Sequence, residues 1–139
     1  MSNIAVIGAG GRMGKALIET IALTEGAELT GALEGPDSSL IGVDAGELAG
    51  IGRNNILVAA SLADIADQFD VLIDFSIPAV TAANAAFCAA HGKKMVIGTT
   101  GLNDEQLQSV SLASQGNAVC MASNYATGVN LCFKLAELA

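Results

Sequence analysis

A run of glycines near the amino terminus constrains the fold more than any other feature of this sequence. The stretch VIGAGGRMGKAL, residues 6–17, places four glycines in seven positions, after an apolar segment and before residues at helical spacing. The glycines are Gly8, Gly10, Gly11 and Gly14. A strand, a glycine turn and a helix in this order predict a βα unit whose backbone another group can approach closely.

The diphosphate of a dinucleotide is the group that best suits such a turn. The helix that follows offers unpaired N–H groups and the positive end of its dipole to an anion. The spacing departs from G-x-G-x-x-G because Met13 occupies the sixth position. It fits the variant G-x-x-G-x-x-G through Gly8, Gly11 and Gly14. A turn that serves only chain reversal and close packing is the alternative interpretation.

Strand-like and helix-like segments alternate along the rest of the chain. Strands are expected over 3–8, 27–34, 56–60, 70–76, 94–101 with its glycine turn, and 117–123. Helices are expected after the glycine turn, in 62–67, over 78–91 and 103–114, and at the end of the chain, with a helical turn inside the long connection 35–55. This alternation predicts an α/β fold, a Rossmann-type doubly wound parallel sheet with helices on both faces.

The charge balance excludes several classes of partner. Fourteen acidic and six basic residues give a net charge of −8, and no basic cluster offsets it, so neither nucleic acid nor anionic membrane is expected to bind. No apolar run approaches the roughly 20 residues of a membrane helix, and no secretory signal is visible, which predicts a cytoplasmic protein. Three widely spaced cysteines favour reduced, buried thiols over disulfides or zinc ligands.

Three further segments follow predicted strands and carry polar groups toward the same edge of the sheet. Glu34 ends the second strand, about 20 residues after the glycine turn, where a carboxylate accepts hydrogen bonds from a ribose. GTTG (98–101) suits a ribose or a nicotinamide edge, and ASNYATG (122–128) faces the same crevice. A solvated carboxylate, an ordinary turn and a helix cap are the respective alternatives.

No residue is nominated as catalytic or as a metal ligand. The sequence contains no Ser-His-Asp, Cys-His or paired-carboxylate arrangement. The single histidine, His91, is expected on the surface at a helix C-terminus, and Asp74 is interpreted as a structural aspartate at a strand end.

Five segments together resemble the amino-terminal domain of the dihydrodipicolinate reductase family. They are VIGAGGRMGKALI, ALEGPDSSLIGVDAGELAG, DVLIDFS, HGKKMVIGTTG and SNYATGVN, in this order, and they extend over essentially the whole chain. The resemblance implies reduction of 4-hydroxy-tetrahydrodipicolinate with NADH or NADPH, in the diaminopimelate route to lysine, by a homotetramer. Another NAD(P)-dependent dehydrogenase and a stand-alone nucleotide-sensing module are the competing interpretations.

The resemblance also implies a role for each candidate residue. The diphosphate would lie on Gly8, Ala9, Gly10, Gly11, Arg12 and Met13, and the adenosine ribose on Glu34. The nicotinamide ribose would meet Gly98, Thr99 and Thr100, and the carboxamide would meet Ala122, Ser123, Asn124 and Tyr125.

Two departures from the family pattern shape the expectations. Many members carry a basic residue after the ribose-binding glutamate, where this chain has Gly35, so NADH is expected to bind at least as well as NADPH. The catalytic signature of the family belongs to a second domain that this sequence does not contain. We therefore expect a dinucleotide-binding domain over 1–125 and, over 126–139, a hinge and first helix leading to that domain. Alone, this fragment is expected to be inactive, and it meets a small-molecule substrate only together with the missing domain.

Overall fold

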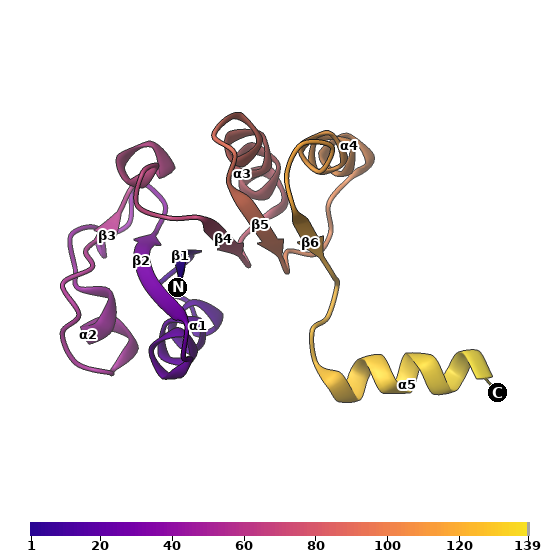
Figure 1. The fold of residues 1–139 in the computed structure, drawn as a ribbon, viewed down its shortest axis with the longest axis horizontal. Coiled ribbons are helices and arrows are strands. Elements are labelled where there is room, and N and C mark those ends of the chain that lie inside the picture. The colour runs from indigo at the N-terminus through magenta and orange to yellow at the C-terminus, as the bar shows by residue number, and fades with distance from the viewer. Residues whose placement is uncertain (139) are drawn as a thin grey trace.

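Six strands form one parallel sheet in the order β3-β2-β1-β4-β5-β6 in the computed structural model, which describes residues 1–138 (Figure 1). The strands are β1 (Ser2–Ile7), β2 (Ala27–Leu33), β3 (Val58–Ala59), β4 (Val71–Asp74), β5 (Lys94–Ile97) and β6 (Val119–Met121). The chain starts at the centre and winds outward first to one edge and then to the other. This order is that of the Rossmann fold, so the predicted fold class is confirmed.

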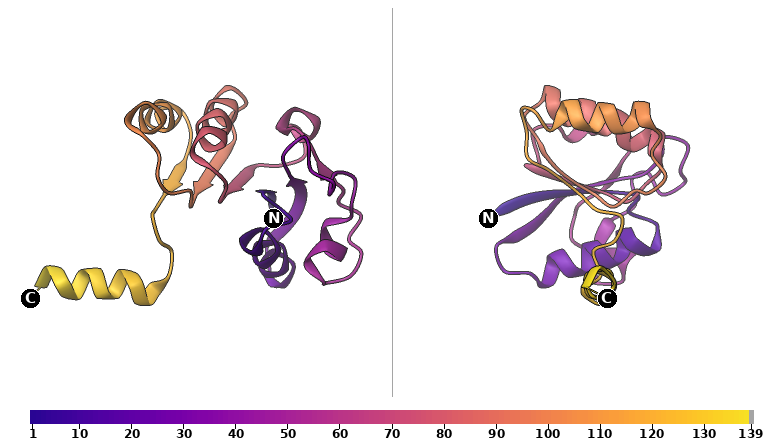
Figure 2. Two further views of the ribbon diagram at one scale, coloured as in Figure 1. Left: turned by 180° about the vertical axis from the view of Figure 1, so that it is seen from behind. Right: turned by 90° about the vertical axis from the view of Figure 1, so that its right-hand side faces the viewer.

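Helices cover the two faces of the sheet unequally. The helices are α1 (Arg12–Leu23), α2 (Ala45–Ala49), the 3-10 turn η1 (Leu62–Ile65), α3 (Pro78–Ala90), α4 (Asp104–Ala113) and α5 (Thr127–Leu138). Figure 2 shows α3 and α4 on one face, α1 on the other, and α5 extending away from the sheet. All described side chains of α5 are exposed, including the apolar side chains of Val129 and Phe133. None of the helices in residues 1–138 combines the length and apolarity that a bilayer crossing requires.

The third strand is shorter than the sequence predicts. Residues 56–60 were expected to be extended, but only Val58 and Ala59 pair with β2. The two residues before them instead pair with the connection 35–55. Leu57 forms an antiparallel bridge with Asp44, and Ala45 N–H donates to the Ile56 carbonyl at 2.8 Å. Backbone groups that this connection satisfies are not available to extend the parallel ladder.

A single carboxylate organises the long connection between β2 and β3. Asp44 is only 4% exposed and accepts hydrogen bonds from the backbone N–H groups of Gly46, Glu47, Asn54 and Asn55. Burial alone raises the pKa of this carboxyl, but the four donors outweigh it and hold the pKa below its ordinary value of 3.8. The same carboxylate caps α2, the helical turn expected in DAGELA.

Apolar side chains from both faces of the strands form two cores. Phe69, Leu72 and Met95 pack under α3 and α4, while Ile18 and Val58 pack on the other face with α1 and α2. The capping box predicted at the start of α4 is present, with Asn103 and Gln106 bonding reciprocally at 2.9 Å each. β1 is therefore buried on both faces at its carboxyl end, whereas β4 and β5 alternate between buried residues and half-buried ones such as Ile73 and Val96, because the helices cover their second face incompletely.

The cysteines divide into one buried and two exposed thiols, so the expectation that all three are buried is wrong. Cys88 is 2% exposed on α3, whereas Cys120 and Cys132 are exposed. The cause is the uneven helix cover, because β6 and α5 have no layer packed over these side chains. Burial, and next the negative charge of Asp74, raise the pKa of Cys88 from 9.0 to about 11, although Lys93 acts in the opposite direction.

We therefore expect an alkylating reagent to modify two thiols quickly and the third slowly. A thiol with a pKa of about 11 holds roughly one thiolate per thousand molecules at pH 8, and only the thiolate reacts. Mass spectrometry after timed labelling would locate the protected thiol at Cys88, and labelling in denaturant would modify all three. Rapid labelling of Cys88 in the folded protein would contradict the structure.

Candidate cofactor-binding site

The register of the sheet brings the predicted site segments to one edge. Ile7 pairs with both Leu33 and Asp74, Asp74 pairs with Ile97, and Ile97 pairs with Met121. Because each of these residues is the last of its strand, the loops that follow begin side by side. The glycine turn, Glu34, the 98–101 turn and the 122–125 segment all start along this carboxyl edge, where ligands of doubly wound sheets bind.

The glycine turn passes from β1 to α1 with its backbone open on one side. Gly8 has a φ of 75°, a conformation that disfavours side chains, and Gly11 is the N-cap of α1. The N–H groups of Gly8 and Ala9 both donate to the Leu33 carbonyl, at 2.9 and 3.0 Å. Gly11 provides no side chain to cap the helix, so the first N–H groups of α1 are offered to a ligand.

Gly14 has a packing role rather than a binding one. A Cβ at this position would overlap the carbonyl oxygen of Gly8 and the Cα of Ala9. The absence of a side chain lets α1 lie directly against the turn that precedes it. Of the three glycines in the G-x-x-G-x-x-G pattern, the last one therefore sets how close the helix and turn approach.

The first turn of α1 borders a cavity of about 450 Å³. Gly8, Gly11, Arg12 and Met13 line it, together with the ring of Phe75 from the β4–α3 turn. Arg12 is the only basic residue that lines any of the three cavities along this edge in the described part of the chain. Helix N–H groups and one guanidinium make this cavity suitable for a diphosphate.

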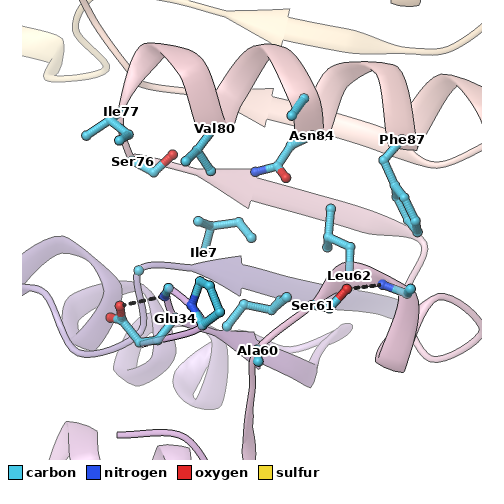
Figure 3. A pocket seen from close by; sticks show the side chains of 16 residues that line it. Ile7, Glu34, Ala60, Ser61, Leu62, Ser76, Ile77, Val80, Asn84 and Phe87 are labelled. Atoms are coloured by element: carbon cyan, nitrogen blue, oxygen red, sulfur yellow. Dashed lines mark hydrogen bonds between the residues drawn. The ribbon is translucent and has the colours of Figure 1, made fainter. Parts of the chain in front are cut away.

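Glu34 lies between the glycine turn and the end of β2. Its Oε1 accepts a hydrogen bond from Gly10 N–H at 2.8 Å, and its Oε2 accepts one from Gly35 N–H at 3.3 Å. The carboxylate lines a second cavity of about 560 Å³ that it shares with Gly8 (Figure 3). Ionised oxygens that retain free lone pairs are suited to accept from ribose hydroxyls.

The second cavity is mainly apolar and extends from Glu34 toward α3. Figure 3 shows Ile7 and Leu62 below it, and Val80, Asn84 and Phe87 above it on α3. No basic side chain in residues 1–138 lines it. The α3 residues were not identified from the sequence. Their spacing of three to four along one helix face is the available signal, but core packing produces the same pattern.

A buried hydrogen-bond network fixes the turns that follow β4 and β5. Asp74 is fully buried and accepts from Ser76 N–H at 2.9 Å, from the Ser76 hydroxyl, and from Asn84 Nδ2 at 2.9 Å. The hydroxyl of Thr81 donates to Thr99 Oγ1 at 2.8 Å, and Thr99 Oγ1 accepts from Ser76 N–H at 3.0 Å. The interpretation of Asp74 as a structural residue is consistent with these contacts.

The two threonines of the 98–101 turn differ in exposure. Gly98 packs against the ring of Phe75 so closely that a Cβ there would overlap the ring. Thr99 is buried, and its hydroxyl is committed to the network, whereas Thr100 is exposed. Phe75 was not singled out from the sequence, although it follows β4 directly.

The 122–125 segment continues the same wall. Ala122 N–H donates to the Ile97 carbonyl at 3.2 Å, and the hydroxyl of Tyr125 donates to the same carbonyl at 2.7 Å. Burial, and next the neighbouring Cys120, raise the pKa of Tyr125, which keeps the hydroxyl protonated as a donor. Ser123, Asn124 and Tyr125 line a third cavity of about 650 Å³ with Met13, Phe75 and Gly98.

The three cavities adjoin one another along the carboxyl edge and are together called the groove; the third also extends under β4 and β5, where Leu17, Ile73 and Val96 line it. The first and second share Gly8, and the first and third share Met13 and Phe75. His91 lies apart from the groove as the C-cap of α3, exposed, with its Nδ1 2.8 Å from the Phe87 carbonyl. That position confirms its interpretation as a surface histidine at a helix end.

Comparison with known proteins identifies the family. The family model described as dihydrodipicolinate reductase, N-terminus, matches residues 2–125. The chain belongs to the dihydrodipicolinate reductase family. A 4-hydroxy-tetrahydrodipicolinate reductase from Saccharophagus degradans is 50% identical over 138 residues, covering 99% of this chain and 52% of that protein. The chain thus spans about half the length of this relative.

Solved structures agree with the assignment. The dipicolinate-bound dihydrodipicolinate reductase from Paenisporosarcina sp. TG-14 superposes with a TM-score of 0.80 at 27% identity, covering all of this chain and 53% of that one. GenD2 from gentamicin A biosynthesis, solved in complex with NAD, has a TM-score of 0.69 at 18% identity, covering 89% of this chain and 35% of that one. At that identity the second likeness establishes the fold alone.

Proposed function

We propose that this chain is the cofactor-binding part of an enzyme that reduces 4-hydroxy-tetrahydrodipicolinate to tetrahydrodipicolinate in the diaminopimelate route to lysine. The observation that carries the proposal is the groove that runs from Glu34 past the glycine turn to Tyr125, in a chain that matches the family over residues 2–125. The cofactor is a nicotinamide dinucleotide, which supplies the hydride when it is bound.

The residues of this chain bind and orient that cofactor. The diphosphate lies against the turn from Gly8 to Met13, and Glu34 accepts from the adenosine ribose. Because the N–H groups of Gly8 to Gly11 are bonded within the protein, the donors to the diphosphate are the first N–H groups of α1, at Arg12 and Met13, and the Arg12 guanidinium. Gly98, Thr99 and Thr100 border the nicotinamide ribose, and Ala122 to Tyr125 border the carboxamide. Since Thr99 is buried with its hydroxyl engaged, its contribution is through the backbone. The ring of Phe75, packed on Gly98, forms an apolar wall at this end of the groove.

The remainder of the proposal concerns the whole protein. Residues 1–125 form the dinucleotide-binding domain, and 126–139 form a hinge and the first helix toward a domain that binds the substrate and forms a homotetramer. The exposed apolar residues of α5, such as Phe133 and Leu135, support this division, while Ala139 lies outside the described residues. The net charge of −8 supports an enzyme without nucleic-acid or anionic-membrane partners, and the proposal places this enzyme in the cytoplasm.

NADH is proposed to bind at least as well as NADPH. Glu34 would repel a phosphate on the adenosine ribose, and the next residue is Gly35. Among residues 1–138, no cation lines the cavity where that phosphate would lie. Arg12 borders the neighbouring diphosphate cavity and is there engaged by the anion of either cofactor.

We expect Glu34→Ala to weaken NADH binding by roughly 10- to 100-fold, the value of one to two charge-assisted hydrogen bonds. The affinity for NADPH should fall less, because the substitution also removes the negative charge that repels its additional phosphate. Parallel calorimetric titrations of NADH and NADPH would measure both effects. Glu28→Ala is the matched control, since Glu28 is an exposed glutamate on the same strand.

The outcomes separate the two parts of the proposal. A clear NADPH preference in the unsubstituted chain would refute the proposed cofactor selection. Failure of both ligands to bind would refute the proposal that these residues hold a dinucleotide by themselves. Equal loss in Glu34→Ala and Glu28→Ala would remove Glu34 from the site.

A further inference from the structure

One acceptor atom in the second cavity has no partner within the described chain. Asn84 is 9% exposed, and its Nδ2 donates to Asp74 at 2.9 Å. No donor of residues 1–138 bonds to the other end of this amide, Oδ1. Every fully buried side-chain oxygen or nitrogen in this part of the chain has a partner, so Oδ1 opens onto the cavity that Asn84 lines.

Asp74 fixes which end of the amide faces the cavity. An ionised carboxylate only accepts hydrogen bonds, and Asp74 already receives the N–H and the hydroxyl of Ser76. Reversing the amide of Asn84 would place its oxygen against a carboxylate oxygen, which is unfavourable. Asp74 takes one of the two Nδ2 hydrogens, so the side chain presents Oδ1 to a ligand as an acceptor. Figure 3 shows this amide facing Ile7 and Leu62 across the cavity.

The rest of the cavity suits a flat aromatic ring. Apolar side chains of Val80 and Phe87 lie along α3, with Leu62 on the opposite side. The Phe87 ring is itself stacked on His91, with centroids 4.0 Å apart, which holds that wall in place. At the other end Glu34 faces the proposed ribose position. A purine attached to that ribose thus extends along α3 toward Asn84.

We propose that Asn84 selects adenine by accepting a hydrogen bond from its exocyclic 6-amino group. This inference rests on the proposed function, since the base must enter the groove as part of the dinucleotide. Adenine carries a donor at this edge, whereas hypoxanthine and guanine carry a carbonyl there. A carbonyl would meet Asn84 Oδ1 as acceptor against acceptor. The residue specifies the base, while Asp74 keeps its amide in the required orientation.

The decisive comparison needs no substitution. Reduced nicotinamide hypoxanthine dinucleotide differs from NADH at one edge of the base, where a carbonyl replaces the 6-amino group and N1 carries a proton, and the affinities of both for the same chain are compared. We expect the hypoxanthine dinucleotide to bind roughly 10- to 100-fold more weakly, because one buried acceptor is left unsatisfied. Adenosine and inosine 5′-monophosphates should show the same ratio, which would assign the difference to this half of the groove.

Two variants assign the discrimination to the amide. Asn84→Ala should bring the two dinucleotides within about 3-fold of each other. Val80→Ala, which changes an apolar wall of the same cavity, should weaken both ligands and leave their ratio unchanged. Thermal melting of each variant verifies folding. If Asn84→Ala does not fold, the comparison in the unsubstituted chain decides alone.

The results distinguish this inference from the proposed function. Equal affinity for NADH and the hypoxanthine dinucleotide would overturn the role of Asn84 and leave the cofactor site intact. Retained discrimination in a folded Asn84→Ala would also overturn that role. Failure of all four nucleotides to bind would overturn both proposals.

Discussion

Gly14→Ala is expected to lower the melting temperature by roughly 10 °C, equivalent to about 3 kcal/mol for a chain of this length. The added Cβ would overlap the carbonyl carbon and oxygen of Gly8 and the Cα of Ala9. Because these are backbone atoms, the overlap can be removed only if the turn and α1 move apart. We also expect dinucleotide affinity to fall by about 10-fold or more, since the diphosphate would meet misplaced N–H groups.

Differential scanning calorimetry and an NADH titration would measure the two effects. Gly116→Ala is the matched control: a Cβ there meets no atom within 4 Å, its φ is compatible with a side chain, and it lies away from the groove. The free energy of unfolding of Gly116→Ala is expected to lie within about 0.5 kcal/mol of that of the unsubstituted protein. An unchanged melting temperature in Gly14→Ala would show that the turn and helix are not packed as the structure has them.

Asp74→Ala is expected to destabilise the fold by about 3–5 kcal/mol and to disorder two walls of the groove. The substitution removes the acceptor for the Ser76 hydroxyl and N–H and for Asn84 Nδ2. The Ser76 hydroxyl and Asn84 Nδ2 then lose a fully buried acceptor, while Ser76 N–H keeps Thr99 Oγ1 as a partner. Because Ser76 also bonds to Thr99, the turns after β4 and β5 loosen together.

Urea denaturation would give the change in the free energy of unfolding, and NADH titration would give the change in affinity. Asp70→Ala is the control, since Asp70 precedes the same strand but is exposed and accepts one hydrogen bond, from Asn3 N–H at 3.3 Å. Asp70→Ala should lower the free energy of unfolding by less than about 1 kcal/mol. Similar destabilisation by both substitutions would contradict the role of the buried network.

Much of the fold could be predicted because local signals agree along this chain. Pro78 at the start of α3, the Asn103 capping box and the apolar runs of β1 and β4 each specify an element without help from distant residues. β3 is the exception, because residues 56–57 pair with the 35–55 connection rather than with β2. Competition between two nonlocal pairings leaves no trace in a periodic pattern.

The candidate site residues that follow a strand end could be predicted from the sequence, whereas those inside a helix could not. Glu34 and the glycines stand out because parallel strands direct their carboxyl ends to one edge. Asn84 and Phe87 occupy helical positions whose apolar neighbours resemble ordinary core. Gly14 was recognisable as part of a pattern, but its contact with Gly8 became evident only in three dimensions.

The sequence by itself determined the alternation of strands and helices, the family, and the order of the polar segments along the groove. These follow from short-range propensity and from residue types at fixed spacing, which a linear chain displays directly. Only the tertiary structure decided which acceptor opens without a partner onto a cavity, which cysteines are covered, and how Asp74 orients the amide of Asn84. Those properties depend on which distant side chains meet and how much solvent remains between them, and no local pattern records either.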